Sequence, residues 1–149
     1  MSDRAVIEPA EIKGSRLPEL IGLASEESSE KRRLLLRELT EHFFGLPAPN
    51  ANENVLYGAV LAKLSDEMEE AVRAELAARF ATAPNAPHSL IRRFADDEIE
   101  VAEEVLRAST VLTDDDLIQI VRKRSQGHLR AVSGRATVSE AVSDVIVEH

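Results

Sequence analysis

The sequence contains no cysteine among its 149 residues, which excludes disulfide bonds, thiolate metal sites and cysteine nucleophiles. Aromatic residues are also scarce, at 3% of the chain. A core must therefore be built mainly from Leu, Val, Ile and Ala, and a platform of aromatic side chains for stacking nucleic-acid bases is not expected. The lack of cysteine also fits a reducing compartment.

Two further absences bear on where the protein acts. The opening segment, MSDRAVIEPAEIKG, has no apolar stretch of the kind found in signal peptides. No apolar run approaches the roughly 18 residues that a membrane-spanning helix needs. The formal net charge is −9, whereas nucleic-acid binding relies on Lys and Arg to neutralise phosphates. We therefore expect a cytoplasmic protein with no membrane span and no nucleic-acid partner.

Motifs that carry catalysis or bind metals are missing as well. The four histidines show no HxxxH or HExxH spacing, and the acidic clusters lack the glycine of a calcium-binding loop. No serine lies in a GxSxG context, and no GxxxxGK[ST] phosphate loop occurs. The sequence thus predicts no metal, no cofactor and no enzymatic activity.

Helical periodicity is present along nearly the whole chain. Alternating β-branched runs do not occur, while apolar residues recur at intervals of three and four. We predict an all-α fold, with helices over residues 15–26, 28–45, 52–64, 65–81, 87–94, 96–109, 113–127, 128–134 and 138–149.

The pattern also predicts how these helices are organised. Residues 1–14 are expected to form a loose arm, and residues 15–149 one helical domain. Two prolines and an asparagine within 82–87 indicate a joint between two layers of that domain. Short amphipathic helices joined by short polar turns favour stacked antiparallel pairs, either as an α-solenoid or as an irregular helical bundle.

Details of three helices can be predicted. The helix at 52–64 should open at Asn52 or Asn54, and its apolar run Val55–Ala62 should be covered on every side. In the next helix, ion pairs of i, i+4 spacing are expected between Glu69 and Arg73 and between Glu75 and Arg79. In the helix at 113–127, Thr113 should cap the start together with Asp116, and Gly127 should provide a left-handed stop.

A basic stretch stands out in this acidic chain. Residues 122–135, RKRSQGHLRAVSGR, hold five Lys or Arg, one His and no acid. Cations favour helix C-termini, which accounts for about half of the cluster. The stretch is either a binding face for an anion or acidic partner, or a set of residues paired with neighbouring helices. The candidate binding residues are Arg122, Lys123, Arg124, His128, Arg130 and Arg135.

The C-terminal part of the chain, residues 94–149, resembles a known family. The segments EVAEEVL, LTDDDL, SQGHL and VSEAVSDVIV, within residues 94–149, resemble the bacterial family called domain of unknown function 2336, which is typical of alphaproteobacteria. The resemblance implies a HEAT-like helical repeat, and members often continue further. The family offers no established activity or catalytic residue to transfer.

We therefore predict a non-enzymatic module for protein–protein interaction, with a protein partner. The alternative is a signalling module in which His42 or His128 accepts a phosphoryl group; nothing in the sequence favours His88 for this role. The last helix keeps its apolar residues Val138, Ala141, Val142 and Val145 up to the final turns. This pattern predicts that the chain is part of a longer protein, or forms a homo-oligomer through that helix.

Overall fold

The computed structural model describes residues 29–46 and 49–149, so the predictions for 1–14 and 15–26 lie outside the described residues. The described part contains helices and no strand, and 76% of it is helical, which confirms the all-α prediction. None of these helices is long and apolar enough to cross a membrane. The helices are α2 (Ser29–Gly45), α3 (Ala51–Asp66), α4 (Glu70–Ala81), α5 (His88–Ala95), α6 (Ile99–Ala108), α7 (Asp114–Lys123), α8 (Gln126–Ser133) and α9 (Glu140–Glu148).

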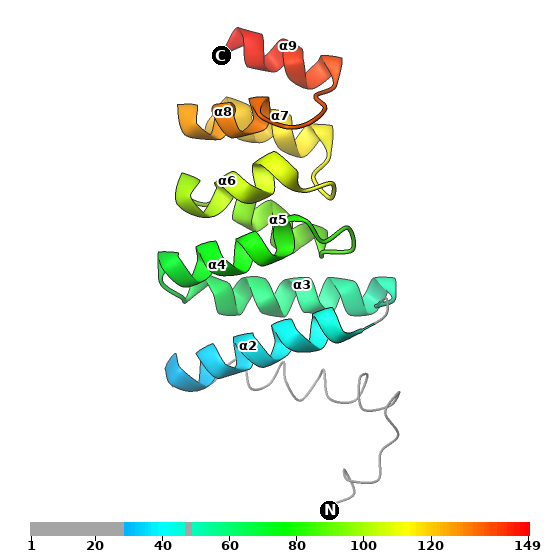
Figure 1. Ribbon diagram of the computed structural model, residues 1–149, viewed down its shortest axis with the longest axis vertical. Coiled ribbons are helices and arrows are strands. Elements are labelled where there is room, and N and C mark those ends of the chain that lie inside the picture. The colour runs from blue at the N-terminus through cyan, green and yellow to red at the C-terminus, as the bar shows by residue number, and fades with distance from the viewer. Residues whose placement is uncertain (1–28, 47–48) are drawn as a thin grey trace, which may run out of the picture.

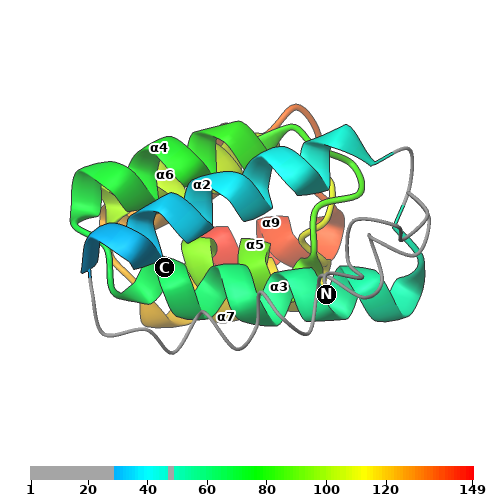
Figure 2. The same cartoon turned by 90° about the horizontal axis from the view of Figure 1, so that it is seen from below.

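The helices form a stack of antiparallel pairs in two layers. Consecutive helices run in opposite directions along the stack (Figure 1). Helices α2, α4, α6 and α8 make up a first layer, and α3, α5, α7 and α9 a second (Figure 2). Within the layers α4 packs on α6 and α6 on α8, while α3 packs on α5 and α7 on α9. Residues 82–87, where a joint was predicted, connect α4 to α5 across the layers.

The core is mostly aliphatic, as composition requires, but aromatic residues cluster where α2, α3 and α4 meet. Phe43, Tyr57 and Phe80 are each at most 1% exposed, and Phe44 packs against two of them. The rings of Phe43 and Tyr57 meet edge to face at 5.4 Å between centroids. Such pairs contribute about 0.5–1.5 kcal/mol beyond the burial of their area. Four of the five aromatic residues thus hold α2, α3 and α4 together.

Two helices begin with reciprocal capping. As predicted, Thr113 caps α7: its hydroxyl accepts from the N–H of Asp116, and the Asp116 carboxylate accepts from the N–H of Thr113. The predicted start of α3 at Asn52 or Asn54 is wrong, because Asn50 is the cap. Its side chain accepts from the N–H of Glu53 at 2.8 Å, and Glu53 accepts from the N–H of Asn50 at 3.1 Å. Among the three asparagines of this segment, only Asn50 is followed by an acid at the third position, which a capping box needs.

Two other local predictions are corrected. Helix α3 is not covered on every side, since Val55 is 67% and Leu56 41% exposed. Gly127 does not stop α7, which ends at Lys123; Ser125 then caps α8, whose first turn contains Gly127. No described glycine has a positive φ. A Cβ on Gly127 would lie 3.1 Å from Cγ1 of Ile99, so the glycine lets α8 approach α6 closely.

The predicted ion pairs within α4 are also wrong. Arg73 pairs with Asp97 at 2.8 Å, Glu69 with Arg33 at 2.9 Å, and Arg79 with Glu41. All three pairs join α4 to another element. Once helices stack, a partner across the interface competes with one on the next turn, and helix periodicity alone does not reveal it.

Candidate interaction site

Of the candidate binding residues in the basic stretch, His128 is buried, Arg135 is partly buried and the other four are exposed. His128 is 2% exposed. Its Nε2 lies 2.8 Å from the carbonyl oxygen of Asp97, so it must donate there, and its Nδ1 lies 2.7 Å from Oγ of Ser125. Nε2 therefore joins α8 to the α5–α6 connection, while Nδ1 is bonded to the residue that caps α8. This arrangement leaves neither nitrogen open to a ligand or a phosphoryl group.

Arg135 is also occupied by structural contacts. Its Nη1 donates to the carbonyl of Leu106 at 2.5 Å, and its Nη2 to the carbonyl of Ser109 at 2.6 Å. These carbonyls lie at the C-terminal end of α6, where backbone acceptors lack partners within the helix. Burial lowers the pKa of the Arg135 guanidinium, and the charge of Asp114 opposes that effect. Arg135 is thus a side-chain cap for α6.

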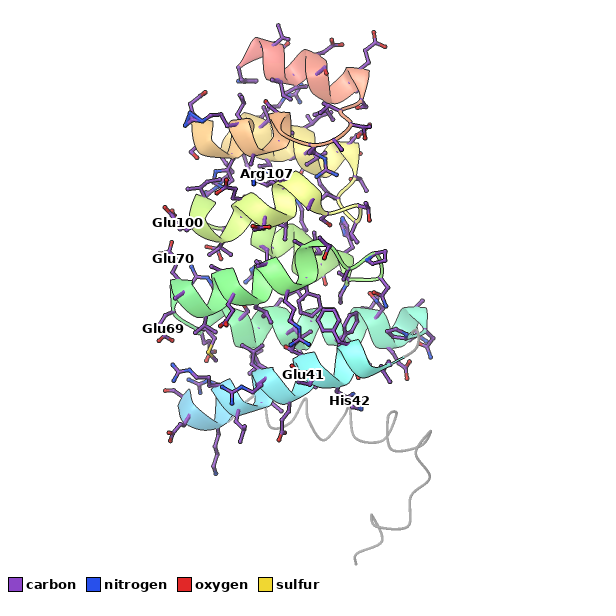
Figure 3. All side chains as sticks on the ribbon, viewed as in Figure 1. Glu41, His42, Glu69, Glu70, Glu100 and Arg107 are labelled. Carbon is purple, nitrogen blue, oxygen red and sulfur yellow. The ribbon has the colours of Figure 1, made fainter. Side chains whose placement is uncertain are left out.

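The remaining basic residues stay on the surface. Arg122, Lys123, Arg124 and Arg130 are all exposed. Arg124 lies 3.8 Å from Asp96, whereas the other three have no ion-pair partner in the part of the chain that the structure describes. Acidic residues lie instead at helix N-termini. Figure 3 shows Glu70 at the start of α4 and Glu100 near the start of α6. Both groups match the helix dipole, which is sufficient to explain their positions.

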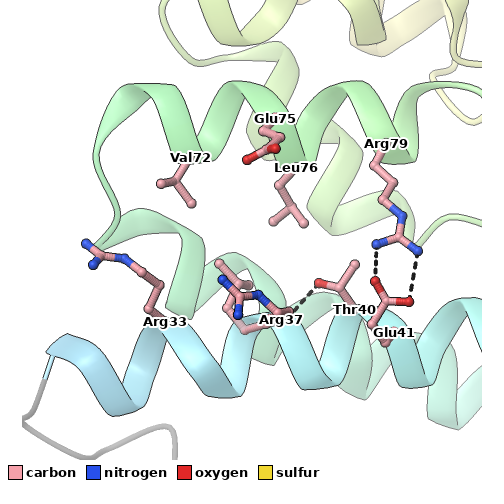
Figure 4. A pocket seen from close by; sticks show the side chains of 9 residues that line it. Arg33, Arg37, Thr40, Glu41, Val72, Glu75, Leu76 and Arg79 are labelled. Atoms are coloured by element: carbon pink, nitrogen blue, oxygen red, sulfur yellow. Dashed lines mark hydrogen bonds and ion pairs between the residues drawn. The ribbon is translucent and has the colours of Figure 1, made fainter.

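A cleft between α2 and α4 is a feature that sequence periodicity did not reveal. These neighbours in the first layer are held apart, unlike α4 and α6, and enclose about 320 Å³ (Figure 4). The walls consist of Arg33, Leu36, Arg37, Thr40 and Glu41 from α2, and of Val72, Glu75, Leu76 and Arg79 from α4.

Ion pairs bridge both ends of the cleft. At one end Nη2 of Arg33 lies 2.9 Å from Oε1 of Glu69. At the other end Arg79 donates from both terminal nitrogens to Glu41, and its guanidinium lies 4.6 Å from the centre of the Phe44 ring. The hydrogen bonds and charge of Arg79 lower the pKa of Glu41 despite slight desolvation. The two pairs connect α2 and α4 at the rims of the cleft.

Between these ends the cleft is apolar at its base and charged on its walls. Leu36 and Leu76 are 4% and 8% exposed, and the hydroxyl of Thr40 donates to the carbonyl of Leu36 at 2.7 Å. Arg37 on α2 and Glu75 on α4 both line the cleft (Figure 4). Neither has an ion-pair partner within residues 29–46 and 49–149. Among the residues that the structure describes, the cleft thus offers a ligand an apolar base together with one cation and one anion that have no ion-pair partner.

The sequence indicates this cleft only through two charge spacings of i, i+4. One is between Arg33 and Arg37, and the other is between Glu75 and Arg79. Each spacing marks a charged face of one helix. It does not show that the two faces oppose each other, because that depends on the stacking of α2 against α4.

Two other histidines occupy different settings. Nδ1 of His42 is hydrogen-bonded to the hydroxyl of Tyr57, whose pKa is raised to about 12 by burial and by the charge of Glu53. Nε2 of His88 lies 2.7 Å from Oδ2 of Asp116, with the His88 side chain 52% exposed. No three His, Asp or Glu side chains of the described segments converge as a metal site requires.

Comparison with known proteins bears on the C-terminal third. Residues 101–149 match the model of domain of unknown function 2336. That family is described as an uncharacterised protein conserved in bacteria. The match confirms the resemblance over α6 to α9, where the capping box of α7 and the structural His128 lie. No curated protein and no solved structure matches the chain.

Proposed function

We propose that this protein is a non-enzymatic protein-interaction module that binds an amphipathic segment of a partner in the α2–α4 cleft. The proposal depends on Arg37 and Glu75, which line the cleft from opposite helices above an apolar base and have no ion-pair partner among the described residues. The two-layer stack of antiparallel helices (Figure 2) supports the interpretation as a HEAT-like α-solenoid. Solenoids expose extended surfaces that suit this use.

The chemistry of the cleft specifies the partner segment. A volume of about 320 Å³ accommodates one or two apolar side chains against Leu36 and Leu76. An acidic residue of the partner would pair with Arg37, and a basic residue would pair with Glu75. On a helix, the acid and the base would flank the apolar residue at i, i+3 or i+4 spacing. A partner segment with acidic but no basic residues would not pair with Glu75, and its negative charges would be repelled by that carboxylate.

The experiment is a selection of helical peptides from a displayed random library against the immobilised full chain. We expect enriched sequences to carry an apolar residue between an acid and a base. Exchanging the charges, by Arg37→Glu together with Glu75→Arg, should weaken a selected peptide by about tenfold or more, which is ~1.4 kcal/mol. Reversing the acid and base in the peptide should restore binding to that double variant.

A matched control uses the exposed basic stretch. Arg122→Glu together with Lys123→Glu changes two surface cations far along the stack and should leave the selected peptide's affinity unchanged. The proposal is contradicted if this control weakens binding while the cleft variant does not. It is equally contradicted if no peptide with the expected charge pattern is enriched.

A further inference from the structure

His88 lies in an environment that none of the other three histidines shares. It begins α5, and its Nε2 lies 2.7 Å from Oδ2 of Asp116. The Asp116 side chain is 12% exposed and also accepts from the N–H of Thr113 at 2.9 Å. An ionised carboxylate only accepts hydrogen bonds, so Nε2 of His88 carries the proton and donates it. In the neutral ring, Nδ1 then holds the lone pair.

The carboxylate of Asp116 is suited to stabilise the Nε2–H tautomer of His88. Burial raises the pKa of Asp116, but hydrogen bonds from Thr113 and His88 outweigh it and hold the pKa below its usual range. Nε of Arg92 lies 3.4 Å from Oδ1 of the same carboxylate. Asp116 is therefore ionised and fixed in place at neutral pH. A fixed carboxylate on one imidazole nitrogen orients the ring and stabilises positive charge that develops on it.

The other ring nitrogen is open. Nδ1 of His88 makes no hydrogen bond to any residue that the structure describes, and the side chain is 52% exposed. His88 borders a shallow hollow of about 450 Å³ that is also lined by Ser89, Arg92, Arg93 and Asp96. An oriented imidazole with one nitrogen on a buried carboxylate and the other facing solvent has the arrangement of an activated nucleophile.

None of the other three histidines combines a ring nitrogen bonded to a buried carboxylate with an open Nδ1, as far as the described residues show. Both nitrogens of His128 are engaged and its ring is buried. Nδ1 of His42 is bonded to Tyr57. His149 is exposed, and its Nε2 lies 3.9 Å from Oε1 of Glu148, which is too far for a hydrogen bond. The sequence-based candidates for phosphoryl acceptance, His42 and His128, are thus less suited than His88.

We propose that Nδ1 of His88 accepts a phosphoryl group from an acyl phosphate donor. The Nδ1 lone pair attacks phosphorus and forms an N–P bond, while the P–O bond to the acyl group breaks and a carboxylate leaves with the electron pair. Nε2 keeps its proton, so the ring becomes cationic and Asp116 balances that charge. The product carries about two negative charges on the phosphoryl group beside the α5–α7 contact.

The experiment incubates the full chain with acetyl phosphate and follows each histidine separately. Acid-labile mass gains are quantified by mass spectrometry, and the modified nitrogen is assigned by ³¹P and ¹⁵N spectroscopy. His149 is the internal control for an exposed imidazole without an orienting carboxylate. We expect His88 to react about tenfold faster than His149. This is the lower end of the change in activity that is typical when a histidine loses a hydrogen-bonded carboxylate.

Two variants and one measurement on the wild type complete the test. His88→Ala should remove the fast site, and Asp116→Asn should reduce His88 to the rate of His149 without changing His149 itself. Because Asp116 also caps α7, the tautomer of His88 is measured independently in the wild type and should be the Nε2–H form. Equal rates at His88 and His149, modification at Nε2, or an Nδ1–H tautomer would each overturn the proposal.

Discussion

Arg73 and Asp97 form a two-pronged ion pair that joins α4 to the connection between α5 and α6. Nε and Nη2 of Arg73 lie 2.8 and 3.0 Å from the two carboxylate oxygens, and both side chains are less than 20% exposed. Nη1 of Arg73 also donates to the carbonyl of Met68. The backbone carbonyl of Asp97 in turn accepts from His128. Through Asp97, the short connection between α5 and α6 thus contacts both α4 and α8.

Replacing Asp97 should therefore destabilise the whole stack. In Asp97→Ala the guanidinium of Arg73 stays largely covered without its acceptor, which costs about 1–3 kcal/mol. Urea unfolding measures this loss. Glu103→Ala, which removes the exposed partner of Arg107 on α6, is the control and should change stability by less than about 0.5 kcal/mol. Equal effects of the two variants would contradict the structural role of Asp97.

The same pair predicts a pH dependence of stability. Burial raises the pKa of Asp97, but hydrogen bonds from Arg73 and the Glu98 N–H, and the charge of Arg73, outweigh it and lower the pKa. A carboxyl whose pKa is lower in the folded state stabilises folding above its unfolded value of about 3.9. That contribution is lost as pH falls from this value through the folded pKa. The stability difference between wild type and Asp97→Asn should be full at pH 6 and shrink towards pH 3; a constant difference would exclude this linkage.

Within the basic stretch, buried and exposed residues should respond differently to substitution. His128→Ala removes a buried ring and two hydrogen bonds and should cost about 2–4 kcal/mol. Arg135→Ala leaves the end carbonyls of α6 without their donor and should cost about 1–2 kcal/mol. Arg130→Ala, at an exposed position, should stay within about 0.5 kcal/mol. Thermal unfolding of the three variants tests this order, and a neutral His128→Ala would contradict it.

Gly58 should be intolerant of a side chain. A Cβ there would lie 2.5 Å from Oγ of Ser89 and 2.8 Å from Cβ of Pro87, so α3 and α5 would have to separate. Gly58→Ala gains helix propensity but overpacks this contact, with an expected net loss of about 1–2 kcal/mol. Gly45→Ala is the matched control, because nothing lies within 4 Å of its Cβ position. Chemical denaturation should show it as neutral or slightly stabilising, and the reverse order would refute the close approach.

Local chemistry could be predicted from sequence, but contacts across helices could not. The Thr113 cap and the helical content depend on residues within one turn of each other, and both are confirmed. The partners of Arg73 and Arg135 lie 24 and 29 positions away, and depend on how helices stack. The α2–α4 cleft likewise depends on how helices stack and could not be predicted from the sequence. Helix periodicity marks which face of each helix is charged, while the separation of two neighbouring helices is set by packing.

Amide chemical-shift mapping of a selected peptide on the ¹⁵N-labelled chain tests most directly whether this protein binds partners through the α2–α4 cleft. The proposal predicts that the largest changes fall on residues 33–41 and 72–79, with Arg37 and Glu75 at their centre. The Arg37→Glu, Glu75→Arg variant should lose those changes while its helical spectrum is retained. Changes centred on residues 122–130, or spread evenly over the stack, would contradict it.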